Sequence, residues 1–225
     1  MNNIISVLKN CILFKNFEEE EIKHILNNIN YKICSYEKQE TIALESDKCN
    51  SIGILLDGTV EIQKLFSSGK TVTVDILHSG DIFGEVIVFS NTNTYPSSII
   101  ASENTIVLFI TKEYILKLCS LNSILLNNLM SLLSNKILML NKKVKYLSYN
   151  TLREKIASFL LEQYSTQKNL TIKLNLSREA LSELLAIPRP SLSRELINMK
   201  KDGLIDFNKN IIVLNSRETL EEILY

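Results

Sequence analysis

Positive charge gathers in one short segment of a chain whose formal net charge is zero. The stretch RPSLSRELINMKK carries four basic residues against one acid: Arg189, Arg194, Lys200, Lys201 and Glu195. Arginine can pair bidentately with the edge of guanine, and lysine neutralises phosphate, so such a stretch is typical of a helix that reads DNA. The structural alternative is the solvated face of an ordinary helical pair.

The candidate DNA contacts divide between bases and backbone. Because the first turns of a recognition helix face the base edges, we expect base contacts from Arg189, Ser193 and Arg194. Other hydroxyl and basic groups of this region are expected to contact phosphates: Ser177, Arg178, Ser191 and Lys201.

The elements around this segment predict a winged helix-turn-helix. Apolar periodicity indicates, in order, a helix, a strand, two helices and a hairpin: 151–164, 168–174, 178–185, 189–201 and 204–214. Ser177 is a favourable N-cap for the first helix of the pair, and Pro188 and Pro190 suit the start of the second. Gly203 supplies the C-terminal cap before the hairpin. This order is that of a helix-turn-helix followed by a wing.

Upstream, apolar residues recur every seven positions in two adjacent stripes: Leu126, Leu133, Leu140 and Leu147, and Leu118, Leu125, Leu132 and Met139. Two stripes on one long helix need two surfaces to cover them. One stripe can pack on the chain's own core, and the other is free for a second copy. We therefore predict a dimerisation helix over 112–147 and a homodimer; the alternative is a helix wholly buried within one domain.

Residues 118–135 form an uncharged run of 18 residues, long enough to be tested as a membrane span. Eight of them are Asn or Ser, which are unfavourable in lipid, so we expect an amphipathic helix and no membrane partner. Lys9 and Lys15 interrupt the apolar N-terminus, which argues against a secretory signal. The expected location is the cytoplasm.

The first half of the chain predicts a β jelly roll with a helical entry. Five of the six glycines fall between positions 53 and 84, and those at 58, 69 and 80 stand in turns between short apolar runs. The predicted strands are 51–56, 59–66, 71–77 and two runs within 99–110, and 17–29 has helical spacing. Strands at these intervals with turn residues between them favour a sandwich or barrel.

Catalytic and metal chemistry is poorly supported. The four cysteines are far apart in the sequence: Cys11, Cys34, Cys49 and Cys119. His24 and His78 are the only histidines. A catalytic cupin would need a cluster of His and carboxylate ligands, which two histidines 54 residues apart do not supply. We expect no enzyme. A second alternative is a ligand-binding jelly-roll module that acts through protein partners without binding DNA.

Two segments resemble the Crp/Fnr family of transcription regulators. LSREALSELLAIPRPSLSRELINMKKDGLI (176–205) is similar to the family's helix-turn-helix, and HSGDIFGEVIVFS (78–90) is similar to the phosphate-binding turn of its jelly-roll sensor. The resemblance covers nearly the whole chain. It implies a homodimer on a roughly palindromic DNA operator, contact with RNA polymerase, and control by an effector bound in the barrel.

The chain departs from the family at functional positions. Cyclic-nucleotide binders of the family carry an arginine where this chain has Tyr95, so cyclic AMP is not expected as the effector. Only Cys11 stands where the iron–sulfur members have a cysteine cluster, and a haem ligand would have to be His24 or His78. Pro190 replaces a base-reading glutamate, so the operator sequence is not carried over.

The sequence therefore predicts an α+β chain: a jelly-roll sensor over 1–111, a dimerisation helix over 112–147 and a winged helix-turn-helix over 148–225. The expected function is sequence-specific transcription regulation under an unidentified effector. The candidate effector pocket comprises Gly84, Glu85, Tyr95, Ser97 and Ser98.

Overall fold

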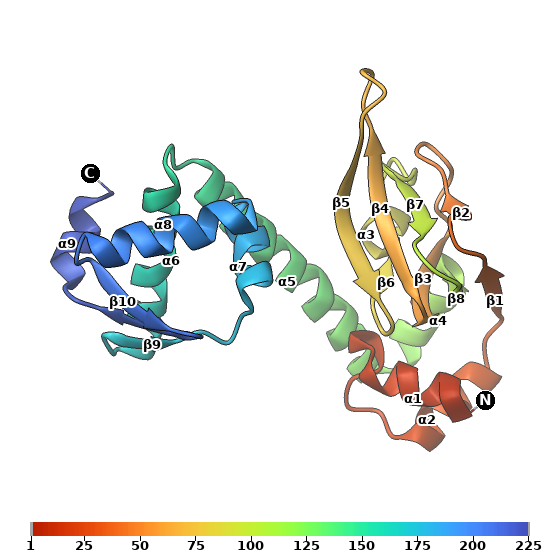
Figure 1. Ribbon diagram of the computed structural model, residues 1–225. Helices are drawn as coiled ribbons and strands as arrows, with labels where there is room; N and C mark the ends of the chain where they lie inside the picture. Colours follow the sequence, from red (N-terminus) through yellow and green to blue (C-terminus); the bar gives the residue numbers. More distant parts are fainter. Residues whose placement is uncertain (1, 225) are drawn as a thin grey trace. The chain divides into compact units, whose positions relative to one another are not determined.

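The computed structural model describes residues 2–224 (Figure 1). The chain divides into two compact units, with the boundary between Ser134 and Asn135. The first unit contains two β-sheets with a helical entry, and the second contains helices around a small sheet. The expected α+β class, with a jelly roll before a helical domain, is confirmed.

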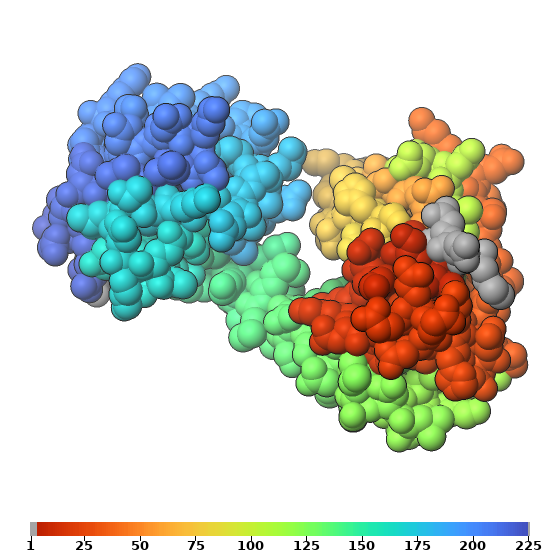
Figure 2. Space-filling model, turned by 90° about the horizontal axis from the view of Figure 1, so that it is seen from below, coloured from red at the N-terminus to blue at the C-terminus, as the bar shows by residue number. Residues whose placement is uncertain are grey.

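The entry is helical: α1 (Asn2–Asn10), the 3-10 helix η1 (Ile12–Phe14) and α2 (Glu19–Asn27). The carboxylate of Glu21 accepts a hydrogen bond from the backbone N–H of Glu18 at 2.8 Å, which fixes the start of α2. Leu13, Phe14 and Ile22 are fully buried against the sheets. In Figure 2 the atoms of α1 and α2 lie at one end of this unit, next to those of α4.

Two four-stranded antiparallel sheets face each other, in the orders β1-β8-β3-β6 and β2-β7-β4-β5. Their strands are β1 (Tyr31–Tyr36), β2 (Thr41–Ala43), β3 (Ser51–Asp57), β4 (Thr59–Leu65), β5 (Thr71–His78), β6 (Ile82–Phe83), β7 (Ser98–Ala101) and β8 (Thr105–Thr111). Ile52, Ile54, Val60 and Leu108 form the core between the sheets. The strands β1, β2 and β6 were not among those expected from the turn signals.

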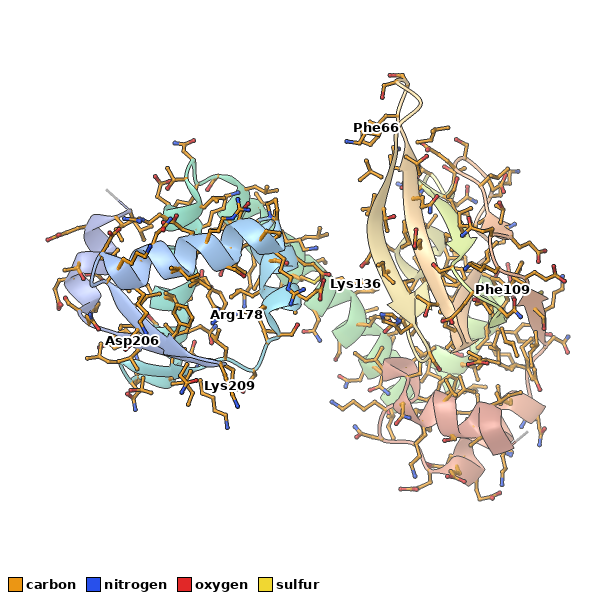
Figure 3. The ribbon with its side chains drawn as sticks, in the orientation of Figure 1. Phe66, Phe109, Lys136, Arg178, Asp206 and Lys209 are labelled. Atoms are coloured by element: carbon orange, nitrogen blue, oxygen red, sulfur yellow. The ribbon has the colours of Figure 1, made fainter. Side chains whose placement is uncertain are left out.

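Asp57-Gly58 forms the tight turn between β3 and β4, as the sequence predicts. Gly58 has φ +85°, and a Cβ there would lie 2.5 Å from the carbonyl oxygen of Asn104. Only glycine meets both demands. Phe66 directly follows β4 and lies near the tip of the β4–β5 hairpin (Figure 3), where its N–H bonds to the carbonyl oxygen of Lys70.

The predicted helix over 112–147 is two helices, so this expectation is corrected. Helix α4 (Lys112–Leu121) ends at Asn122, where φ is −138°, and α5 (Ser123–Leu147) begins after it. The side-chain oxygen of Asn122 accepts from the N–H groups of Ile124 and Leu125 at 3.0 and 3.2 Å. Asparagine caps a new helix in this way more readily than it continues an old one, which explains the break.

By length and composition α5 could cross a membrane. Much of its surface is exposed in the single chain, but two of its polar side chains are buried and hydrogen-bonded to protein. Asn128, which is buried, donates from Nδ2 to the carbonyl oxygens of Leu13 and Lys15 at 3.1 and 2.7 Å. At the other end Tyr146 is buried in the core of the second unit and donates to Glu162 at 2.9 Å.

The second unit contains a three-stranded sheet, β10-β11-β9, and four helices beyond the end of α5. Its elements are α6 (Leu152–Gln167), β9 (Thr171–Lys173), α7 (Arg178–Leu185), α8 (Arg189–Lys201), β10 (Ile205–Asn208), β11 (Ile211–Leu214) and α9 (Arg217–Glu222). We call the β10–β11 hairpin, 205–214, the wing.

Candidate nucleic-acid interface and barrel site

Helices α7 and α8 form a helix-turn-helix whose ends are fixed by local signals. The hydroxyl of Ser177 accepts from the N–H of Ala180 at 3.0 Å and caps α7, as predicted. Ala186 adopts φ +50° in the turn. After α8, the N–H of Gly203 bonds to the carbonyl of Lys200 at 3.1 Å and that of Leu204 to Met199 at 3.0 Å. This paired arrangement around a glycine in the left-handed region ends the helix cleanly.

One side of α8 is buried and the other is exposed. Leu192, Leu196 and Met199 are almost fully buried against α7, α6 and the wing. At about 100° per residue, the positions opposite them form what we call the outer face of α8: Pro190, Arg194, Ile197 and Lys201. All four are exposed. Ser193, also exposed, borders this face, and Arg189 is exposed one turn earlier, at the start of α8.

The single acid of α8 does not reduce the charge of the outer face. Glu195 lies toward α6, where its carboxylate is 2.7 Å from Nε of Arg153. Nη1 of the same arginine is 2.7 Å from Asp202, just after α8. These two carboxylates raise the pKa of Arg153, chiefly through the hydrogen bond to Glu195. Arg189 and Arg194 form no ion pair within residues 2–224, so their charge is available to a ligand.

The phosphate-contact candidates are more varied in their surroundings. Lys201 is exposed at the end of α8, whereas Ser191 is half-buried in its first turn. The hydroxyl of Ser177 is engaged as a cap. Arg178 is half-buried, and burial lowers the pKa of its guanidinium. All the predicted DNA-contact residues thus lie in one helix-turn-helix. Among the basic ones, Arg178 is the least exposed.

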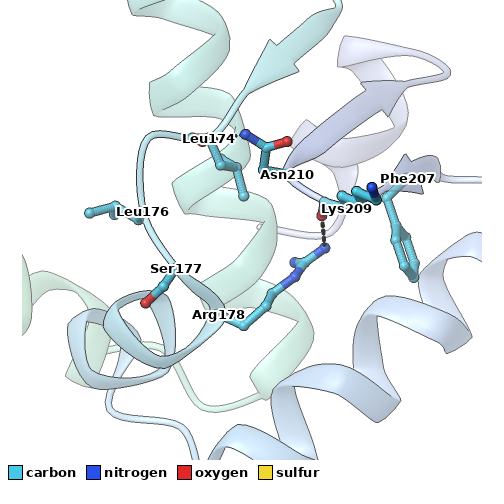
Figure 4. A pocket seen from close by; sticks show the side chains of 7 residues that line it. All are labelled: Leu174, Leu176, Ser177, Arg178, Phe207, Lys209 and Asn210. Atoms are coloured by element: carbon cyan, nitrogen blue, oxygen red, sulfur yellow. Dashed lines mark hydrogen bonds between the residues drawn. The ribbon is translucent and has the colours of Figure 1, made fainter.

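Arg178 lies in a hollow of about 410 Å³ between α7 and the wing (Figure 4). Its Nη2 donates to the carbonyl oxygen of Lys209 at 3.0 Å, and its Nη1 has no hydrogen-bond partner within the described chain. Figure 3 shows Arg178 and Lys209 close together in the second unit. Sequence reasoning missed Arg153, Phe207 and Lys209. The available signal was a lysine between two asparagines in the predicted hairpin turn.

In the barrel, two residues assigned to the effector pocket, Gly84 and Glu85, form the start of a short helix, α3 (Glu85–Val88), and the Tyr95 hydroxyl lies near it. Gly84 caps it with φ +80°, and a Cβ there would lie 3.0 Å from the carbonyl oxygen of Ser51 and 3.1 Å from Sγ of Cys49. The next nearest atom is the hydroxyl oxygen of Tyr95, at 3.6 Å. Glu85 is 1% exposed and Tyr95 is 7% exposed. The site is therefore closely filled by its own side chains.

Tyr95 is held on a loop that is hydrogen-bonded to the segment before β3. Its N–H donates to the carbonyl of Asp47 at 2.9 Å, and its carbonyl accepts from Ser46 at 2.8 Å. Burial, with a hydrogen bond to Cys49, raises the pKa of the Tyr95 hydroxyl. Cys49, a neighbour that the sequence gave no reason to select, is buried, and burial also raises the pKa of its thiol. Both groups are neutral at physiological pH.

The two serines of the predicted pocket differ. Ser97 is buried, whereas Ser98 is half-buried at the start of β7 and its hydroxyl accepts from the N–H of Glu45 at 3.0 Å. The structure thus places the Tyr95 hydroxyl near Gly84 and gives Ser98 a role in holding the loop at Glu45. The Ser98 hydroxyl is thus already engaged by the backbone N–H of Glu45.

Helix α5 separates its two leucine stripes over its first half. Leu118 on α4, with Leu125 and Leu132 on α5, is buried against the barrel, whereas Met139, the last residue predicted for this stripe, is exposed. The second stripe is exposed apart from Leu133, which is half-buried. We call it the exposed stripe of α5, and it repeats at intervals of four and three residues: Leu126, Met130, Leu133, Ile137, Leu140, Val144 and Leu147.

Comparison with known proteins agrees with this architecture. Residues 33–122 match the family model of a cyclic nucleotide-binding domain, and residues 154–223 match that of a Crp-like helix-turn-helix domain. The anaerobic regulatory protein of Bacillus subtilis is 27% identical over 190 residues, covering 82% of this chain and 80% of that protein. The global nitrogen regulator of Synechococcus elongatus is 23% identical over 189 residues, covering 81% and 85%.

The fold also matches that of solved relatives. The catabolite activator protein of Thermus thermophilus aligns over 95% of this chain and 98% of its own, with a TM-score of 0.55 and 22% identity. The two matched domains stand in the same order as the barrel and the helix-turn-helix described above. The chain belongs to the Crp/Fnr family of DNA-binding transcription regulators.

Proposed function

We propose that the chain regulates transcription as a homodimer that binds an inverted-repeat operator through α8. The observation that carries the proposal is the charge arrangement on this helix: Arg189 and Arg194 are exposed and unpaired, while Glu195 is bound by Arg153 on the inner side. We assign base contacts to Arg189, Ser193 and Arg194. Phosphate contacts are assigned to Ser177, Arg178, Ser191 and Lys201.

The exposed stripe of α5 supports the homodimer. Its four-three spacing is that of a two-stranded coiled coil, and an isolated chain would leave these side chains in water. A two-fold dimer presents two copies of α8, so the half-sites are expected about one helical turn apart, roughly 34–36 Å.

The barrel is proposed as the effector domain, but its residues do not fit a cyclic nucleotide. A cyclic phosphate carries a negative charge and requires a positive partner when it is buried. The atoms nearest to the Cβ position of Gly84 belong to Ser51, Cys49 and Tyr95, all neutral. Tyr95 also replaces the arginine that cyclic-nucleotide binders of the family carry. We propose a different, unidentified effector at or near Gly84, Glu85, Tyr95, Ser97 and Ser98.

The location and partners follow from the same assignment. A regulator of this type acts in the cytoplasm, where the operator lies, and its further partner is RNA polymerase. The relatives are named as regulators, and we propose that this chain has no catalytic activity.

Selection of binding sites from a random duplex pool, with the purified full-length chain, tests the DNA proposal. The expected product is an inverted repeat with half-sites about one helical turn apart. Enrichment of a sequence without two-fold symmetry would contradict the dimer. Failure to enrich any sequence would contradict specific DNA binding by this chain.

A further inference from the structure

The aromatic ring of Phe207, on the wing strand β10, lies beside two cations from different helices. The guanidinium carbon of Arg178, in the first turn of α7, is 5.3 Å from the ring centroid. Nζ of Lys200, in the last turn of α8, is 5.6 Å from it. Both distances are within the range of cation–π attraction. One side chain of the wing therefore contacts both helices of the helix-turn-helix.

Hydrogen bonds with Arg178 and Leu174 hold the turn of the wing, Asn208–Asn210. The guanidinium of Arg178 donates to the carbonyl oxygen of Lys209 at 3.0 Å (Figure 4). On the other side, the carbonyl of Asn210 accepts from the N–H of Leu174 at 2.8 Å, and its side-chain amide donates to the Leu174 carbonyl at 3.3 Å. The turn is thus fixed through its backbone, and the side chain of Lys209 is left exposed.

The conformation of Lys209 makes a lysine there a costly choice. Its φ is +51°, in the left-handed region where glycine or asparagine is more favourable. Asparagine stands on both sides of it. Within residues 2–224 its ammonium group forms no ion pair that would compensate. A cation in an unfavourable conformation and without an internal ion-pair partner points to a ligand outside the chain.

We propose that Phe207 is a positioning residue that, through Arg178 and Lys200, holds the wing turn so that Lys209 contacts the phosphate backbone of DNA. The proposal rests on the proposed function. It gives Arg178 a second role beside its proposed phosphate contact. Its Nη2 binds the wing, and its Nη1, which has no partner within the described chain, is free for a phosphate. Lys200 is likewise engaged, since Nζ is 2.5 Å from the carboxylate of Asp206.

The test is the salt dependence of binding to a non-specific duplex, which requires no knowledge of the operator. Each phosphate contact contributes about 0.9 to the slope of log Kobs against log salt concentration. Lys209→Gln is expected to make the slope of the dimer shallower by about 1.8, one contact per wing. Phe207→Met removes the ring but no charge, and we expect the same change. The double variant should show no further change, and Phe207→Tyr should restore the slope.

Three controls separate positioning from general damage. Lys173→Gln removes an exposed lysine from the neighbouring strand β9 and should leave the slope unchanged. Lys209→Gly relieves the left-handed conformation, so the midpoint of thermal unfolding should stay or rise while the slope becomes shallower. Arg178→Lys keeps the charge but loses the guanidinium geometry that reaches the Lys209 carbonyl. If Phe207→Met does not fold, Arg178→Lys replaces it as the test, and the same shallower slope is expected.

An unchanged slope for Lys209→Gln would show that the wing turn does not contact phosphate. If Phe207→Met folds and binds with the wild-type slope, whatever its affinity, the positioning role is wrong. If Phe207→Met does not fold, a wild-type slope for Arg178→Lys would contradict the positioning role in the same way. Absence of any duplex binding by the unmutated chain is a different result, because it would contradict the proposed function itself.

Discussion

The helix-turn-helix and the barrel site treat their polar groups in opposite ways. On α8, Arg189, Arg194 and Lys201 are exposed and form no ion pair within residues 2–224, and the acid is turned inward to Arg153. Around Gly84, the side chains of Glu85, Tyr95 and Cys49 are buried, and the Tyr95 hydroxyl and the Cys49 thiol are neutral. A surface that meets a polyanion can keep its charges in water until the partner arrives. A small-molecule site must be built from buried groups that fit one ligand, so its chemistry changes more readily between relatives.

The largest expected effect comes from the helix that serves both regions. Replacing Leu133 and Leu140 together by Glu places two carboxylates from each copy in the proposed seam of α5. We expect monomers in sedimentation velocity and a loss of operator affinity of about 10³-fold or more, toward non-specific binding. The matched control replaces Asn135 and Lys142 by Glu, away from the exposed stripe, and should remain dimeric. A wild-type monomer at micromolar concentration would rule out the seam.

The next effect tests the exposed side of the comparison. Arg194→Ala should cost about 1–3 kcal/mol on the selected operator and relax the preference at one base pair per half-site. Lys201→Ala, on the same outer face but at the far end of α8, should weaken all duplexes about equally and make the salt dependence shallower. Titrations on operator and unrelated duplex at two salt concentrations separate these outcomes. An Arg194→Ala protein with unchanged site preference would remove the assignment of α8 as recognition helix.

A smaller effect tests how α8 is held. Arg153→Ala leaves the mostly buried carboxylate of Glu195 without its partner, and we expect the free energy of unfolding to fall by about 1–3 kcal/mol in urea titrations. Arg217→Ala breaks a more exposed ion pair, with Glu221, and should lower the free energy of unfolding by less than Arg153→Ala does. Equal losses would mean that the Arg153 pair contributes no more than a surface contact.

The smallest expected effect tests the buried side. Cyclic AMP at millimolar concentration should give little or no saturable heat in calorimetry, because Tyr95 and Cys49 offer no counter-charge to a cyclic phosphate. Inorganic phosphate and adenosine serve as controls for the two halves of the nucleotide. A micromolar dissociation constant would break the comparison and would require a cation from elsewhere in the barrel.

The same contrast explains what could be predicted from the sequence. Caps and glycines act locally, so the start of α7 at Ser177 and the end of α8 at Gly203 were predictable, as was the turn at Gly58. Contacts between distant residues were not. Nothing in the spacing places Arg153 beside Glu195 or Cys49 beside Tyr95, because these pairs form only when the helices pack and the strands pair. The break at Asn122 was missed because heptad spacing continues across it.

The exposed stripe of α5 also restricts how the length of this helix can vary between related chains. Its side chains repeat at four and three residues over Leu126–Leu147, so the stripe depends on helical phase. Deleting one residue in the middle would turn the later half of the stripe by about 100° relative to the earlier half. Deleting seven would shorten the helix and leave one straight stripe. Tolerated insertions and deletions within α5 are therefore expected in multiples of seven.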